Sequence, residues 1–262
     1  MRLACICYLL ISLTACQKVI NVNLDNTASK YIVVGKITNE PGASQVSITR
    51  SKNFSEDNDF PGVSGATVTV ENNGVATTLP ETAPGIYSVS SLTGQPGQTY
   101  TLVIHLGDQT FTATSTMPQP VNFDSMYVST ARLSNNKYVT VIYKDPLNIA
   151  NYYHFIQYVN GRKEESIFVD DDEFTDGQTV KAQLNYNNST DNHARDIKSG
   201  DSVRIDMICN DAAVYKFWFS LNNGATGTGE SASPSNPVSN ISGAVLGYFS
   251  AQTIQSRAIK AD

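Results

Sequence analysis

Hydrophobic and polar residues alternate along most of the chain from Tyr31 onward. Short runs of period two, rich in β-branched and aromatic side chains, are separated by turn residues such as Asn72-Asn73-Gly74, a pattern typical of antiparallel strands. In the first half this pattern predicts strands at Tyr31–Thr38, Gln45–Arg50, Ala66–Glu71, Val75–Leu79, Ile86–Ser90, Tyr100–Leu106 and Gln109–Ser115. Seven short strands within about 90 residues are typical of a β-sandwich, which we expect to span residues 31–117.

A proline-rich segment, Met117-Pro118-Gln119-Pro120, separates the two halves of the chain. Two prolines in three residues stiffen the backbone and are excluded from central strands, so they predict a domain boundary. Residues 121–262 are then expected to form a second β domain. Its predicted strands are Ser125–Ser129, Tyr138–Tyr143, Tyr152–Asn160, Ser166–Val169, Thr179–Tyr186, Ser202–Cys209 and Val245–Phe249, the last followed by a polar tail. The predicted fold class is mainly β, with two β-sandwich domains.

One segment of the second half, residues 211–222, has helical periodicity. Apolar residues recur there at spacings of three and four, Asp211 (or Asn210) is placed to cap the N-terminus, and Gly224 follows the end, which predicts a short helix. Its apolar face consists of Val214, Phe217, Trp218 and Leu221. We expect this face to cover an edge or end of a sheet. Residues 224–239, rich in Gly, Ser and Pro, predict a loop.

The N-terminal segment has the pattern of a lipoprotein signal peptide. Arg2 is followed by an apolar run that ends at Leu13, and this run is shorter than the roughly 20 residues that span a bilayer. The sequence Leu13-Thr14-Ala15-Cys16 matches a bacterial lipobox, in which the Cys16 thiol receives a diacylglyceryl group and the chain is cut before it. We expect residues 1–15 to be a signal peptide and residues 16–30 a lipidated tether at a membrane. An ordinary secretory signal is the alternative.

Charge and cysteine content narrow the class of protein further. The formal net charge is −6, which argues against nucleic-acid binding, since that requires a basic surface. Cys5 and Cys7 lie within the signal peptide and Cys16 is the expected lipid-attachment residue, so Cys209 is left without a disulfide partner. Cys209 shares a strand face with apolar neighbours and is expected to be a buried small hydrophobe rather than a nucleophile.

Motifs that carry enzyme chemistry are mostly absent from the sequence. It contains no Gly-x-Ser-x-Gly elbow, no His-Glu-x-x-His, no Cys-x-x-Cys and no phosphate-binding glycine loop. His105, His154 and His193 are far apart, and we interpret them as structural or solvent-exposed. The aromatic residues Tyr152 and Tyr158, with Tyr153 between them, flank one strand and could line a glycan-binding groove, but a role in the core is favoured. We expect the protein not to be an enzyme.

An acidic segment, Asp170-Asp171-Asp172-Glu173-Phe174-Thr175-Asp176-Gly177, is the densest cluster of charge. Calcium binds several carboxylate oxygens around one loop, and Asp170, Asp172 and Asp176 could supply them. The spacing does not match an EF-hand loop. A solvated acidic turn between two strands is therefore the favoured interpretation, with calcium or a metal-assisted hydrolase as alternatives and no other cofactor expected.

Three stretches of the chain carry a resemblance to a known family. They are Tyr31–Glu40 (YIVVGKITNE), Val63–Val70 (VSGATVTV) and Asn240–Phe249 (NISGAVLGYF). Together with the lipobox, they resemble an uncharacterised lipoprotein family of Bacteroidota often encoded beside TonB-dependent outer-membrane receptors. The resemblance implies an immunoglobulin- or transthyretin-like first domain, a larger second β domain and no catalytic residues to carry over. Cys16 is not followed by the acidic run of surface-displayed lipoproteins, so the resemblance leaves open which face of the outer membrane the protein occupies.

The expected function follows from this combination of anchor and β scaffold. We expect a non-enzymatic outer-membrane lipoprotein that serves as an accessory or ligand-binding partner of a TonB-dependent receptor in nutrient uptake. One alternative is a fimbrial or adhesin subunit, in which a segment of one copy completes the sandwich of its neighbour. Another is a glycan-binding β-sandwich module.

Overall fold

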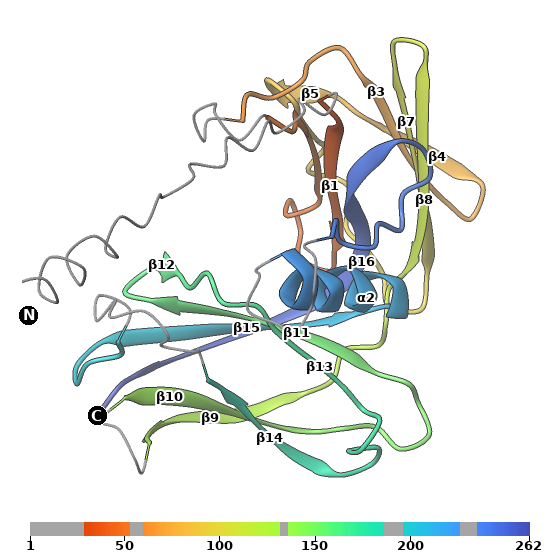
Figure 1. Cartoon of the computed structure of the whole chain (residues 1–262). Coiled ribbons are helices and arrows are strands. Elements are labelled where there is room, and N and C mark those ends of the chain that lie inside the picture. The colour runs from red at the N-terminus through yellow and green to blue at the C-terminus, as the bar shows by residue number, and fades with distance from the viewer. Residues whose placement is uncertain (1–28, 53–59, 132–135, 186–195, 226–234) are drawn as a thin grey trace, which may run out of the picture.

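The computed structural model describes residues 29–52, 60–131, 136–185, 196–225 and 235–262. Residues 1–15, Cys16, most of the expected tether 16–30, His193 and most of the expected loop 224–239 lie outside the described residues. Figure 1 shows two groups of strands, one above and one below a short helix.

The first half of the described chain forms two sheets that pack face to face. Its strands are β1 (Tyr31–Thr38), β2 (Gln45–Arg50), β3 (Thr67–Asn72), β4 (Val75–Leu79), β5 (Glu81–Ala83), β6 (Ile86–Ser88), β7 (Thr99–Leu106) and β8 (Gln109–Thr116). Strands β1-β2-β6-β5 lie in one sheet and β4-β3-β7-β8 in the other. Alternate residues of both sheets, such as Val33, Ile48, Val68 and Leu102, form a shared core. The predicted strands are confirmed, and β5 is an addition.

The second half of the described chain also consists of two layers of strands. Its strands are β9 (Phe123–Thr130), β10 (Lys137–Lys144), β11 (Tyr152–Val159), β12 (Arg162–Lys163), β13 (Phe168–Asp171), β14 (Thr179–Leu184), β15 (Ser202–Asn210) and β16 (Val245–Lys260). A three-stranded sheet, β14-β10-β9, packs against β11 and β15 over a second core that includes Phe123, Val141, Phe155 and Ile205. The mainly β prediction is confirmed.

Strand β16 connects the two halves. Residues 245–252 pair in parallel with β1, whereas residues 253–260 pair antiparallel with β15, so one nine-stranded sheet runs through the molecule (Figure 1). The expectation that the last strand ends at Phe249 and is followed by a polar tail is wrong. Polar side chains beyond Phe249 form hydrogen bonds with other segments. Gln255 Nε2 donates to Val121 O at 2.8 Å, and Ser256 Oγ donates to Asp206 Oδ1 at 2.7 Å.

The predicted division into two domains at residues 117–121 stays a prediction. Met117 packs into the first core and Val121 into the second, so the change of core falls within the proline-rich segment. Phe249 of β16 nevertheless belongs to the first core, because the parallel pairing returns the chain to β1. The last strand is therefore divided between both cores.

Gly247 shows why this parallel pairing needs a glycine. Its φ is +100°, and a Cβ there would lie 1.9 Å from the carbonyl oxygen of Val33 on β1. A side chain is excluded on both counts, since positive φ is strained for other residues and the space is filled by backbone.

The helix α2 (Ala212–Ser220) continues into a single π-helical turn, η2 (Leu221–Ala225). Asp211 caps it as predicted, with Oδ1 accepting from Val214 N at 3.0 Å. Val214 and Phe217 pack on Tyr248 of β16, and Trp218 and Leu221 join them, which confirms the predicted apolar face. The helix contacts the central strand β16, the neighbouring region of β11, and β13 at the edge of the nine-stranded sheet, on the face opposite the cores.

Candidate functional site

Two connections between sheets meet at one end of the second half. Residues 145–151 join β10 to β11, and residues 172–178 join β13 to β14. Because β10 pairs with β14, and β11 pairs with β13, the two connections lie side by side. The backbone N–H of Asp145 donates to the carbonyl oxygen of Gln178 at 2.9 Å. Sheet pairing therefore determines which side chains of these segments meet.

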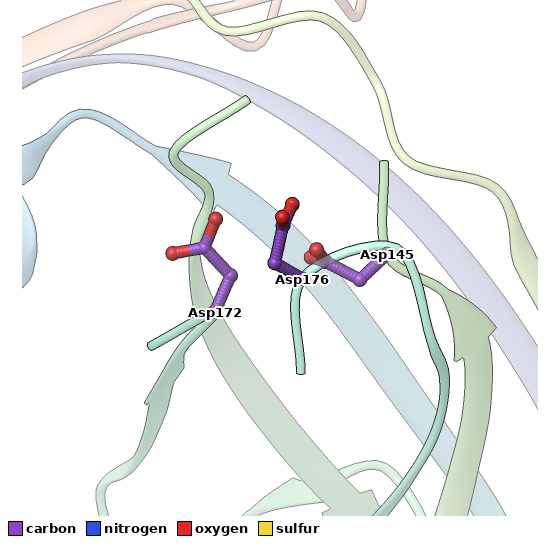
Figure 2. Close-up of side chains that lie close together, drawn as sticks. All are labelled: Asp145, Asp172 and Asp176. Carbon is purple, nitrogen blue, oxygen red and sulfur yellow. The ribbon is translucent and has the colours of Figure 1, made fainter. Parts of the chain in front are cut away.

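Three carboxylates converge between these connections. Asp145, Asp172 and Asp176 each place one carboxylate oxygen within 4.8 Å of the others (Figure 2). Asp145 follows β10 and is 1% exposed, Asp172 is half-buried and Asp176 is exposed. The cluster, called here the acidic cluster, thus extends from the interior to the surface.

Backbone hydrogen bonds fix the two carboxylates of the turn. Asn151 N donates to Asp172 Oδ2 at 3.0 Å, and Asn148 N donates to Asp176 Oδ1 at 2.7 Å. Each carboxylate of one connection is thus held by an N–H of the other connection. The remaining oxygens, Oδ1 of Asp172 and Oδ2 of Asp176, accept no hydrogen bond within the described part of the chain.

Asp145 is held differently, from inside the core. The hydroxyl of Tyr153 donates to Asp145 Oδ1, whereas Asp145 Oδ2 is buried and has no hydrogen-bond partner. Burial raises the pKa of the Asp145 carboxyl, and the negative charges of Asp172 and Asp176 raise it further, against the lowering effect of the Tyr153 hydroxyl and the Gly177 backbone N–H. Among the residues that the structure describes, no basic side chain forms an ion pair with the cluster. Within that part of the chain, the carboxylates therefore meet hydrogen-bond donors but no basic side chain.

The acidic cluster agrees only in part with the residues predicted from sequence. Asp172 and Asp176 come together in the expected turn between two strands, but Asp170 does not join them. Asp170 lies on β13, lines a separate cavity of about 180 Å³, and accepts from the N–H of Asp171 at 3.1 Å. Sequence reasoning missed Asp145, whose only local signal is its place between a predicted strand and Pro146.

Exposed apolar side chains occur on the same two connections as the acidic cluster. Phe174 is 82% exposed, Leu147 65% and Ile149 55%. Leu147 packs over the turn, where a Cβ on Gly177 would lie 2.7 Å from Leu147 Cδ1. These three residues are called here the apolar tip. Large exposed apolar side chains on two adjoining connections make this end of the second half a candidate interaction surface.

A separate cavity of about 400 Å³ lies between α2 and β11. Trp218 and Leu221 line it from the helical side, and His154 and Ile156 from the strand. The rings of His154 and Trp218 lie 4.4 Å apart, and burial lowers the pKa of His154 to about 3. This volume falls within the range of small-molecule sites, and the imidazole lining it is uncharged at neutral pH.

Comparison with known proteins gives a family but no activity. The model of a domain of unknown function, DUF4249, matches residues 17–258. The chain belongs to the DUF4249 family. No curated protein is significantly similar to it. Of the residues described, none form a helix with the length and hydropathy needed to cross a bilayer.

The other residues singled out from sequence occupy structural positions in this DUF4249 protein. Cys209 is buried with a free thiol, as expected, and burial raises its pKa. His105 is exposed on β7. The three tyrosines of β11 do not line one groove: Tyr153 points into the core, Tyr152 packs on Tyr215 with ring centroids 5.2 Å apart, and Tyr158 lies 4.0 Å below the Arg204 guanidinium.

Proposed function

We propose that this DUF4249 protein is a lipid-anchored, non-enzymatic protein of the outer membrane. In this proposal it is an accessory or ligand-binding partner of a TonB-dependent receptor in nutrient uptake. The observation that carries the proposal is Leu13-Thr14-Ala15-Cys16 at the end of a signal-like apolar run. The family match begins at residue 17, directly after the cysteine that would carry the lipid. Several acyl chains on one residue give stable attachment, whereas a single chain gives only marginal binding.

The apolar tip is the surface that supports partner binding. Its three side chains project from two short connections that are tied to each other by backbone hydrogen bonds and held by paired strands. Burying an apolar side chain of this size contributes about 1.5–3 kcal/mol. A partner that covers all three side chains therefore gains a large part of the binding free energy of a specific interface. Short loops on a rigid scaffold are common binding elements.

The first experiment tests the anchor and the partner together. We expect the tagged full-length protein, purified from detergent-solubilised native outer membranes, to be accompanied by a TonB-dependent receptor in stoichiometric amount. The Cys16→Ser variant should lose acylation and leave the membrane fraction. Recovery of the protein alone would contradict the receptor partnership, and recovery as a self-associated ladder would favour the fimbrial alternative. An acylated protein found in the inner membrane would contradict the localisation.

A second experiment tests the surface. Replacing Leu147, Ile149 and Phe174 together with serine should sharply reduce the receptor that co-purifies, while membrane attachment is retained. The matched control replaces Val75 and Tyr127 with serine, because these exposed apolar residues lie on β4 and β9, away from the tip. An equal loss of receptor in both variants would show that the tip is not the binding surface.

A further inference from the structure

The acidic cluster contains a buried carboxylate oxygen that the protein does not satisfy. Asp145 is 1% exposed, Tyr153 donates only to its Oδ1, and its Oδ2 has no hydrogen-bond partner. Figure 2 shows the carboxylate of Asp145 directed toward Asp176, and Asp172 lies on the far side of Asp176. A buried charged oxygen without a donor is costly, and a cation between the carboxylates supplies the missing interaction.

The donor atoms and their spread select the class of cation. The acidic cluster offers carboxylate oxygens without sulfur or imidazole nitrogen, a donor set that suits Ca²⁺ or Mg²⁺ rather than zinc or copper. Oxygens on opposite sides of a Ca²⁺ ion lie about 4.6–5.2 Å apart, against about 4.0–4.2 Å around Mg²⁺. All three cluster oxygens lie within 4.8 Å of one another and so fit within one Ca²⁺ coordination sphere.

We propose that Asp145, Asp172 and Asp176 form a calcium-binding site that joins the two connections between the sheets of the second half. The two hydrogen bonds to Asn148 and Asn151 already orient the carboxylates of Asp176 and Asp172, so binding does not require a new loop conformation. Asp145 provides the inner ligand, and the exposure of Asp176 leaves room for water to complete the coordination sphere.

The expected consequence of binding is mechanical. Residues 145–151 leave the three-stranded sheet and enter the nine-stranded sheet, whereas residues 172–178 run the opposite way. One ion bound between these two connections therefore holds them together, and with them the adjoining ends of both sheets. It also fixes the segments that carry the apolar tip, whatever partner the tip contacts.

Terbium luminescence and thermal unfolding test the site on the purified full-length protein after treatment with a chelator. Tyr153 contacts Asp145 and is close enough to sensitise bound Tb³⁺. We expect saturable Tb³⁺ emission at one ion per chain, displaced by Ca²⁺ at lower concentration than by Mg²⁺. At a hundredfold excess over its Kd, Ca²⁺ should raise the Tm by roughly 5–10 °C.

Two substitutions in the same turn distinguish a specific Ca²⁺ site from nonspecific attraction of the cation to negative charge. Asp176→Asn removes a ligand charge but keeps an oxygen for Asn148 N, and its exposed position spares the fold; it should weaken Ca²⁺ binding at least about tenfold. Glu173→Gln removes an exposed charge three residues away and should leave binding unchanged. Asp145→Asn should abolish the Tm increase, and its Tm in chelator shows whether the variant folds.

The outcomes that overturn the calcium site are specific. They are an absence of saturable Tb³⁺ emission, a Tm that Ca²⁺ does not change, displacement by Mg²⁺ as effective as by Ca²⁺, or an equal loss of affinity in Asp176→Asn and Glu173→Gln. None of these measurements requires a receptor. Failure of the calcium site is therefore distinguishable from failure of the proposed function.

Discussion

The hydroxyl of Ser115 donates a hydrogen bond to Asp211 Oδ2 at 2.5 Å and accepts one from Ala251 N at 2.8 Å. Asp211 Oδ1 caps α2 by accepting from Val214 N. One carboxylate therefore starts the helix of the second half and ties it to β8 of the first half and, through Ser115, to β16. The junction between the halves depends on a polar contact as well as on the shared strand.

Loss of this carboxylate should destabilise the whole protein. Asp211→Ala removes a helix cap and leaves Ser115 without its acceptor, so we expect the free energy of unfolding to fall by about 2 kcal/mol. Urea denaturation measures it. Asp211→Asn, which keeps an acceptor oxygen, should lose less, and Asp108→Ala, at an exposed turn residue, should be near neutral. A fall no larger than that of Asp108→Ala would contradict the role of Asp211.

The parallel pairing of β16 with β1 should not tolerate a side chain at residue 247. Gly247→Ala combines a positive φ with a contact against Val33 O, and we expect it to cost about 3 kcal/mol or more. Gly65→Ala is the matched control, because Gly65 also has a positive φ but nothing lies within 4 Å of its Cβ position; it should cost about 1 kcal/mol. Similar losses of unfolding free energy would refute the steric argument.

The buried imidazole of His154 should make the protein sensitive to acid. Its pKa is lowered to about 3 by burial, below the value near 6.5 of an unfolded histidine. The unfolded chain therefore binds a proton that the folded chain does not. Stability from this residue is full above pH 6.5 and falls by about 1.4 kcal/mol per pH unit between pH 6.5 and 3.

Unfolding free energies measured across that range test the role of His154. The slope of stability against pH should be smaller in His154→Phe than in the wild type. His105→Gln removes an exposed imidazole and should retain the wild-type slope. An unchanged slope in His154→Phe would show that other groups cause the acid sensitivity.

The thiol of Cys209 should be unreactive in the folded protein. It is buried between strands, and burial raises its pKa, which lowers the thiolate fraction. We expect a thiol reagent to label Cys209 at least about a hundredfold faster in denaturant than in buffer. Comparable rates in both conditions would place Cys209 at the surface.

Local pattern was sufficient for most strands but not for the end of the chain. Alternation and turn residues locate β1 and β7 because each strand buries every second residue. Residues after Phe249 lack that alternation, and they form a strand because β15 supplies a partner for their backbone and Asp206 and Val121 bind their polar side chains. The local sequence pattern does not predict these partners.

The acidic cluster, likewise, could be predicted only in part from local sequence. The turn with Asp172 and Asp176 is evident from composition, since both carboxylates lie in one short polar segment. Asp145 is 27 residues away from Asp172 in the chain and joins them only because β10 pairs with β14 and β11 pairs with β13. Asp170, although adjacent in sequence, lies on a strand and is directed elsewhere.

The sequence by itself determined the features that are read locally: the strand positions, and a helix with its cap at Asp211. It also predicts the lipobox at Cys16. Each depends on residues within a few positions of one another. Tertiary structure alone decided that β1 and β16 pair, that His154 is buried and uncharged, and that Asp145 meets Asp172 and Asp176. These features require chain segments far apart in sequence to close on each other, and the free energy of that closure comes from the two cores and the shared sheet.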